Sequence, residues 1–286
     1  MATSREMTEG RALPLIFNFT LPLLLGNLLQ QTYSLVDAAI VGKFLGINAL
    51  ASVGASTSVI FLILGFCNGC CGGFGIPVAQ KFGARDYITM RRYVAVSLQL
   101  AAVMSVVLAV VTSICCADIL RMMRTPDNIF TGAYYYLLVT FIGVPCTFFY
   151  NLLSSIIRAL GDSKTPFWFL LVVVALDMAL NPLLIFGWGP VPRMGIQGSA
   201  VATLIANAVS FTALLGWLRL RRHPLWIGRR QLGLFKPDLT IVRTLVVKGL
   251  PMGVQIVMIS LAMIAMISMV NEHGVQTASA YSAALQ

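Results

Sequence analysis

Seven long apolar stretches constrain the fold of this 286-residue chain more than any other feature. Each reaches the roughly 20 apolar residues that an α-helix needs to cross a bilayer. Backbone polar groups in hydrocarbon must be paired within the segment, which a helix achieves and an open sheet does not. The sequence therefore predicts an all-α, polytopic helical membrane protein. The stretches cover residues 14–41, 47–76, 93–117, 131–156, 166–187, 195–218 and 245–270, and an eighth begins near 276.

Composition supports the same class. Hydrophobic residues make up 58% of the chain and charged residues 10%, whereas soluble domains carry about 25% charged residues. All six cysteines lie in or beside apolar stretches. Cys67, Cys70 and Cys71 have a spacing found in metal sites, but no second cluster or nearby His accompanies them. We therefore interpret them as small packing residues, and we expect no metal site and no cofactor.

The formal charge of +10 is distributed unevenly along the chain. Fifteen Lys and Arg precede the first stretch or lie between stretches 2–3, 4–5 and 6–7, a sixteenth, Lys248, lies on the same side at the start of the seventh stretch, and four lie on the opposite side. The positive-inside rule then predicts a cytoplasmic N-terminus and a multi-pass location in the cell inner membrane. This pattern explains the basic excess without a nucleic-acid partner. No cleavable signal peptide is visible, so the first stretch is expected to act as its own anchor.

The charge pattern also suggests how the chain is organised. Residues 1–218 are expected to form one six-helix lobe, followed by a basic cytoplasmic linker at 219–244. Residues 245–286 would begin a second lobe, because the eighth apolar stretch stops without a cap or a flank. We expect the chain to be a C-terminally truncated part of a longer protein.

Two local patterns predict helix contacts and helix ends. Gly65, Gly69 and Gly73 recur every four residues, a spacing that lets neighbouring membrane helices approach closely. The segment 161–166 reads as a break between two helices. In it, a left-handed glycine closes one helix, and a capping Thr165 and a first-turn Pro166 start the next. Asp162 and Lys164 would then be solvated loop charges.

Only two of the ten acidic residues, Asp37 and Asp177, lie inside long apolar stretches. A carboxylate at membrane depth costs at least about 2.5–3.5 kcal/mol on insertion scales, so it normally faces a hydrated cavity or an ion path. Asp37 lies six residues before Lys43, about 9 Å from that helix end, and Asp177 lies ten residues before Gly187, about 15 Å from its end. Because both stretches run in the same direction, we expect the two acids to share one site.

Uncharged polar residues surround both acids at helical spacing. We expect Asp37, Asp177, Asn181 and Thr203 to bind a coupling ion, H⁺ or Na⁺. The alternative is a purely structural role, in which both acids are neutral and their hydrogen bonds are all satisfied within the protein. Tyr134, Tyr135 and Tyr136 are interpreted as anchors at the membrane interface. The expected cavity residues are Asn27, Gln30, Gln31, Ser34, Asn151 and Asn207, with Thr140, Thr147, Ser154, Ser199 and Ser210 on the same stripes.

Several motifs in order resemble the multidrug and toxic compound extrusion (MATE) transporters. They are Leu21-Pro22, NLLQQTYSLVDAAIVG at 27–42, PVAQKFG at 77–83, IRALGDSKTP at 157–166, NPLLIFG at 181–187 and MGIQGSA at 194–200. The resemblance implies twelve helices in two six-helix lobes, of which this chain supplies the first lobe, the seventh helix and the start of the eighth. It also implies a monomer when full length.

The family's function gives further expectations. Its members export organic cations and drugs against a proton or sodium gradient by alternating access, and Asp37 matches the acid of the first helix that binds the coupling ion. Some members carry Asn and then Asp on the fifth helix, whereas here Asp177 precedes Asn181. Another branch uses a glutamate on the seventh helix, where this chain has no acid and Gln255 is the nearest polar group. These features favour the DinF-like branch, with Gln255 as a further cavity residue.

The sequence disfavours three other classes of protein. A lipid-linked oligosaccharide flippase of the same superfamily would need several basic residues facing its cavity, and the cores of the first six stretches carry none. A seven-helix receptor or sensor does not explain the eighth stretch or the paired acids. An intramembrane aspartyl protease would need a Gly-x-Gly-Asp motif, but Ala175 and Leu176 precede Asp177. The chain is therefore expected to be a transporter and not an enzyme, with a small-molecule substrate and the lipid bilayer as partners.

Overall fold

A computed structural model describes residues 11–45, 47–123, 125–187, 193–221, 225 and 238–272. These residues form α-helices and no strand, so the predicted all-α class is confirmed. Seven of the helices are long and apolar enough to cross a membrane. The predicted eighth span, from 276, lies outside the described residues. The helices are α1 (Ala12–Leu45), α2 (Ile47–Gly83), α3 (Tyr87–Ile114), α4 (Cys116–Met122), α5 (Asp127–Ala159), α6 (Lys164–Phe186), α7 (Ile196–Leu220) and α8 (Leu239–Glu272).

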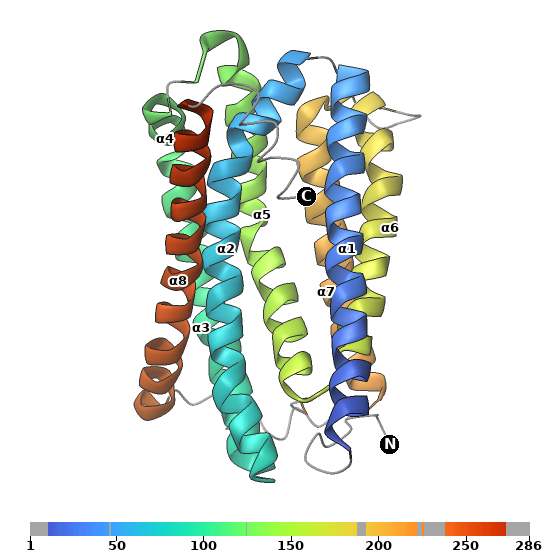
Figure 1. The fold of residues 1–286 in the computed structure, drawn as a ribbon, viewed down its shortest axis with the longest axis vertical. Helices are drawn as coiled ribbons and strands as arrows, with labels where there is room; N and C mark the ends of the chain where they lie inside the picture. The colour runs from blue at the N-terminus through green and yellow to red at the C-terminus, as the bar shows by residue number, and fades with distance from the viewer. Residues whose placement is uncertain are drawn as a thin grey trace.

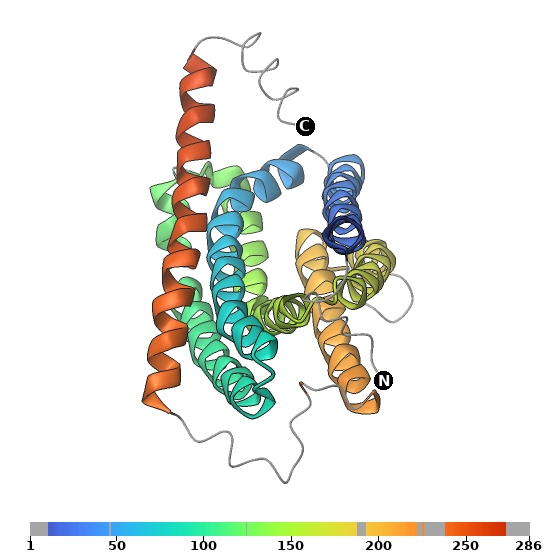
Figure 2. The same cartoon turned by 60° about the horizontal axis from the view of Figure 1, so that its bottom comes forward.

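Helix α5 lies at the centre of the bundle (Figure 1). On one side it packs against α2 and α3, and α8 lies along the outer face of α2 (Figure 2). On the other side α5 contacts α7, which pairs with α6, and α6 in turn contacts α1. We call the end at which α1 begins and α5 ends the lower end, as drawn in Figure 1, and the opposite end the upper end.

The apolar core lies between α2, α3 and α5. Phe148, Leu152 and Ile156 of α5 are fully buried in it. Cys67, Cys70 and Cys71 of α2 belong to the same cluster as buried, unbridged thiols. This placement agrees with their interpretation as packing residues, because small side chains fill the space where two helices approach closely.

The glycine stripe of α2 contacts the backbone of α8. A Cβ atom built at Gly69 would lie 2.5 Å from the carbonyl oxygen of Met252, and one at Gly73 would lie 2.5 Å from the Cα of Gly249. On the α8 side, a Cβ at Gly253 would lie 2.6 Å from the Sγ of Cys70. Side chains larger than hydrogen therefore cannot occupy these positions without moving the two helices apart. The predicted packing role of the α2 glycines is confirmed for Gly69 and Gly73.

The start of α8 and the end of α3 differ from the sequence prediction. Helix α8 begins at Leu239, inside the segment predicted to be linker, and Asp238 accepts a hydrogen bond from the Thr240 amide (3.0 Å). The predicted third span is divided, because α3 ends at Ile114 and the short α4 follows. Hydropathy alone did not reveal this break, since residues on both sides of it are apolar.

The break between α5 and α6 corrects the prediction for Asp162. Gly161 has the expected left-handed conformation (φ +85°), and Pro166 lies in the first turn of α6. Asp162 is buried, however, and accepts hydrogen bonds from the amides of Lys164 and Thr165 (3.0 Å each) and from Oγ1 of Thr165 (2.6 Å). The predicted solvated Asp162 and capping Thr165 are wrong, because the carboxylate satisfies the orphan donors of this helix start. Lys164 is exposed, as expected.

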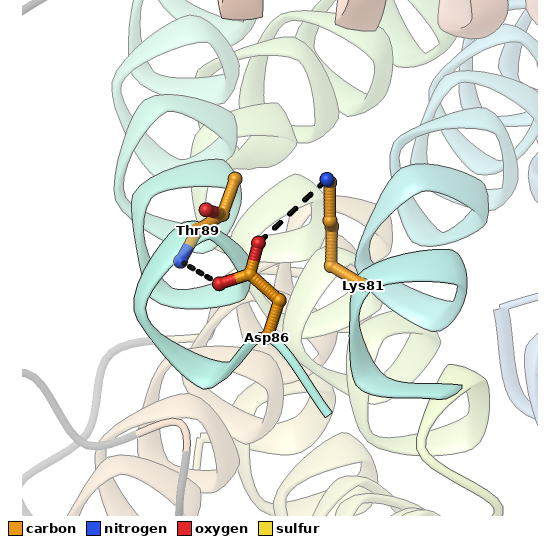
Figure 3. A network of polar contacts seen from close by, with 3 residues as sticks. All are labelled: Lys81, Asp86 and Thr89. Atoms are coloured by element: carbon orange, nitrogen blue, oxygen red, sulfur yellow. Dashed lines mark hydrogen bonds and ion pairs between the residues drawn. The ribbon is translucent and has the colours of Figure 1, made fainter. Parts of the chain in front are cut away.

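Helix α3 begins at an acidic cap at the lower end of the bundle. Asp86 accepts a hydrogen bond from the Thr89 amide (3.1 Å) and lies 3.7 Å from the Nζ of Lys81 (Figure 3). Hydrogen bonding by Thr89 and the nearby ammonium of Lys81 lower the pKa of Asp86 from its ordinary value. The ionised carboxylate thus holds the first turn of α3.

Replacing Gly73 with Ala should destabilise the contact between α2 and α8. The added methyl group must displace backbone atoms of α8, and such overpacking typically costs about 1–3 kcal/mol. Denaturant unfolding of the purified protein in nanodiscs would measure the change. Gly54→Ala is the control on the same helix, because a Cβ there meets nothing within 4 Å. Equal stabilities of the two variants would contradict the close contact.

Acidification should loosen the start of α3. A lowered pKa means that the cap's contribution is fully present above the ordinary pKa of an aspartate and is lost as the pH falls through the lowered value. Amide hydrogen exchange in the first turn of α3, corrected for the intrinsic pH dependence, should therefore lose protection below about pH 4. In Asp86→Asn, which keeps an acceptor oxygen but does not titrate, protection should not change over this range. An identical pH response in both proteins would contradict the assignment.

Candidate functional site

A polar cavity of about 730 Å³ lies between α1, α2, α5, α6 and α7. Both membrane acids, Asp37 and Asp177, line it. A long seam of α5 faces the same space, with one residue on each successive helical turn. The predicted residues that the structure brings to the cavity are Asn27, Gln30 and Ser34 of α1, Asn151 of α5, and Thr203 and Asn207 of α7. Thr140, Thr147 and Ser154 of α5 lie there too.

Four of the predicted residues do not line this cavity. Ser199 and Ser210 of α7 are buried, and Gln31 and Gln255 are exposed. Gln31 is exposed on α1, because it follows Gln30 and so points about 100° away from the cavity-facing stripe. Gln255 is exposed on α8. That helix presents Gly249 and Gly253 to α2, and a residue two positions after Gly253 points to nearly the opposite side. Gln31 and Gln255 therefore do not line the cavity that the described residues form, contrary to the sequence prediction.

The carboxylate of Asp37 accepts hydrogen bonds from two helices. The Asn181 amide nitrogen Nδ2 donates to its Oδ1. The Ser199 hydroxyl on α7 lies 3.3 Å from Oδ1 and 3.5 Å from Oδ2. Asn181 is 1% exposed and does not line the cavity itself, so it acts on the site through Asp37.

The carboxylate of Asp177 has its own donors. The Tyr33 hydroxyl on α1 donates to Oδ2, and Thr203 Oγ1 on α7 lies 3.4 Å from the same oxygen. The hydroxyls of Tyr33 and Thr203 are 3.5 Å apart. Sequence reasoning missed Tyr33, although its position one turn before Asp37 was a usable signal.

Helices α1 and α6 pair reciprocally. They run in the same direction, and each supplies one acid and one hydrogen-bond donor, spaced four residues apart. Tyr33 of α1 meets Asp177 of α6, and Asp37 of α1 meets Asn181 of α6. With the order Asn-then-Asp on α6, the two carboxylates would face each other across the interface. The order found here, Asp177 and then Asn181, therefore places each acid opposite a hydrogen-bond donor on the other helix.

Two buried acceptor atoms of this network lack a donor among the described residues. They are Oδ1 of Asp177 and Oδ1 of Asn181. Buried polar atoms without a partner are uncommon in folded proteins and call for an explanation. Both are oxygen atoms one helical turn apart, beside a second carboxylate, and oxygen ligands of this kind suit a proton or a hard cation.

The three tyrosines at the start of α5 have separate environments. Tyr136 lines the cavity above Thr140, whereas Tyr135 is 45% exposed on the outer face. The interpretation of all three as interface anchors is therefore wrong for Tyr136. Helical periodicity explains the difference, since adjacent residues point about 100° apart.

The chain that carries this site is similar to a known protein family. Residues 22–183 match the family model described as MatE, which covers more than half of the chain. The chain belongs to the MatE family. This confirms the transporter family that the sequence motifs resemble, and the matched segment of the MatE chain contains Tyr33, Asp37, Asp177 and Asn181.

Two curated relatives extend the MatE likeness along the chain. The probable multidrug resistance protein YoeA of Bacillus subtilis (strain 168) is 36% identical over 98% of this chain and 62% of its own length. The probable multidrug resistance protein YpnP of the same strain is 31% identical over 97% of this chain and 60% of its own. The MatE chain thus spans about three fifths of the length of these relatives.

Solved structures show the same fold. The crystal structure of MATE in the bent conformation superposes with a TM-score of 0.88 at 24% identity, covering all of this chain and 62% of that chain. At this identity the likeness establishes the fold of the MatE chain alone.

Cysteine labelling should distinguish the cavity face of α5 from its outer face. Thr140→Cys should react with a charged, water-soluble maleimide at least about ten times faster than Ile142→Cys, because a thiol reacts as thiolate and needs water. Thr140 lines the cavity, and Ile142 is 59% exposed on the apolar outer face. Rates would be measured in membranes, relative to the parent protein with its native cysteines. Faster labelling of Ile142→Cys would contradict the cavity assignment.

Proposed function

We propose that the full-length protein is a secondary active antiporter that exports organic cations and drugs by alternating access, with Asp37 and Asp177 binding the coupling ion. The observation that carries the proposal is the reciprocal pairing of α1 and α6 beside a polar cavity. The names of YoeA and YpnP as probable multidrug resistance proteins support the substrate class.

The coupling works through charge. With both carboxylates ionised, the cavity attracts a cationic substrate in a low-dielectric environment where such attraction is strong. Protonation of either acid removes one negative charge, weakens the hydrogen bond that Tyr33 or Asn181 donates to it, and so changes the contact between α1 and α6. The cation is then held less tightly and is released as the helices repack. Each pH unit supplies about 1.4 kcal/mol per proton, and the membrane potential adds about 2.3 kcal/mol per charge per 100 mV.

Na⁺ is the alternative coupling ion. The oxygens of Asp37, Asp177, Asn181 and Thr203 are ligands of the type that Na⁺ binds, and two of them lack a donor among the described residues.

With either ion, the protein would be a monomer in the inner membrane of the cell. Its lower end would face the cytoplasm. Lys81 lies in the last turn of α2 and Arg219 in the last turn of α7, and because both helices end at the lower end, these basic residues favour this orientation.

Asp37→Asn and Asp177→Asn should each abolish gradient-driven transport. In everted vesicles from cells expressing the full-length protein, a pH gradient should drive ethidium uptake in the wild type, by at least about tenfold over either variant, because an amide cannot bind and release a proton. A sodium gradient would be imposed separately to identify the ion. Asp118→Asn is the control, since Asp118 is an exposed residue of α4 beside Arg121, away from the cavity.

The outcome decides between two functions. Transport that is retained in both variants would exclude the two acids as the coupling site. A wild type that moves no dye under either gradient would favour the lipid-linked oligosaccharide flippase. That alternative expects several basic residues in the cavity, and among the described lining residues there is one, Arg158.

A further inference from the structure

Among the residues that the structure describes, one basic side chain lines the lower end of the cavity. Arg158 lies in the last turn of α5, and its partly buried side chain faces the same space as Asp37 and Asp177. By sequence it counts among the basic residues of a cytoplasmic loop. The structure instead continues α5 to Ala159, which carries Arg158 onto the cavity face.

The position follows from the helical period. Tyr150, Ser154 and Arg158 are spaced four residues apart on α5, and all three line the cavity. They continue the seam that begins with Tyr136 and Thr140 at the upper end. The seam therefore changes from phenols and hydroxyls to a guanidinium as it approaches the lower end.

Arg158 is not needed to cap its own helix. The last carbonyl groups of α5 already accept backbone hydrogen bonds in the turn that follows: Gly161 N–H donates to the Arg158 carbonyl (2.9 Å), and Asp162 N–H donates to the Ile157 carbonyl (3.3 Å). The usual structural role of an arginine at a helix C-terminus is thereby filled by the backbone.

No carboxylate of the described residues forms an ion pair with Arg158. Asp162, the acid nearest in sequence, directs its oxygens to the first turn of α6 through Lys164 and Thr165. The acids of the cavity lie far above, because Asp177 is thirteen residues into α6, about 20 Å along the axis from the end that adjoins Arg158. A partly buried guanidinium without a counter-charge favours an anion as ligand.

Neighbouring side chains offer further donors. The Ser163 hydroxyl lines the same end of the cavity and makes no capping hydrogen bond to α6. Tyr150 and Asn151 lie above it on α5. A planar guanidinium with hydroxyl and amide groups nearby is the donor set that recognises a carboxylate or a phosphate.

We propose that Arg158 is an anion subsite, and that the cargo is amphoteric: its carboxylate or phosphate binds Arg158, while its cationic group binds at Asp37 and Asp177. The proposal rests on the proposed export function and specifies the substrate class of that cavity. A cargo shorter than the separation of the two ends engages them in succession, and a longer one engages both together.

Two rhodamines that differ by one ester test the subsite. Rhodamine 110 carries a free carboxylate, and rhodamine 123 is its methyl ester, so the pair differs in the anionic group alone. Their dissociation constants would be measured by fluorescence polarisation with the full-length protein in nanodiscs. Arg158→Gln should lower the acid-to-ester affinity ratio by about tenfold or more, as expected for the loss of a charge-assisted hydrogen bond. Arg92→Gln, at an exposed arginine outside the cavity, is the matched control and should leave the ratio unchanged.

Two further measurements keep the test decisive if Arg158→Gln does not fold. Arg158→Lys keeps the charge but not the planar two-point contact. This variant should still bind the acid more tightly than the ester, but with a smaller affinity ratio than the wild type. In the wild type, excess inorganic phosphate should displace rhodamine 110 but not rhodamine 123. An unchanged ratio in the Arg158 variants, equal displacement of both dyes, or no saturable binding of the acid would overturn the proposal.

The two proposals can fail separately. Gradient-driven dye transport together with an acid-to-ester affinity ratio that does not change in the Arg158 variants would overturn the anion subsite and leave the efflux function intact. An Arg158-dependent ratio without transport under either gradient would overturn the efflux function and leave the subsite.

Discussion

The pairing of α1 with α6 through the half-buried carboxylate of Asp37 and the buried carboxylate of Asp177 is the interaction on which the site depends. In a medium of low dielectric constant, a carboxylate without donors is costly, so each acid requires a partner on the facing helix. Tyr33 and Asn181 meet that requirement from opposite sides, and Ser199 and Thr203 add donors from α7. In the proposed mechanism, the contacts that hold the three helices together are also the ones that change when a proton or cation binds.

Helix α5 separates this responsive side from the rigid one. Its apolar face packs into the core with α2 and α3, while its polar seam lines the cavity toward α1, α6 and α7. Because the two faces belong to one helix, the shift of α1 and α6 in the proposed mechanism would take place against a helix face that the core holds in position. The seam runs from Tyr136 to Arg158, so a molecule in the cavity meets different chemistry at each end.

Sequence reasoning recovered the spans and the shared acidic site because both follow from the bilayer. Apolar length determines where helices can lie, and depth along two parallel spans placed Asp37 and Asp177 near one another. Orientation around the helix axis was harder to predict. Gln30 and Gln31 are equivalent by composition, yet only Gln30 lines the cavity. Tyr33, Asp162 and the short helix α4 were missed because hydrogen bonds and packing between elements decide them, and local sequence does not report these.

The backbone contact between α2 and α8 has a consequence for biogenesis. Gly73 and Gly249, which meet across this contact, are separated by 176 positions in the chain, so α2 is synthesised long before its partner. Until then the glycine positions of α2 have no α8 backbone to pack against. The contact between α2 and α8 can therefore form only after α8 has been synthesised, and it joins α8 to the outer face of α2.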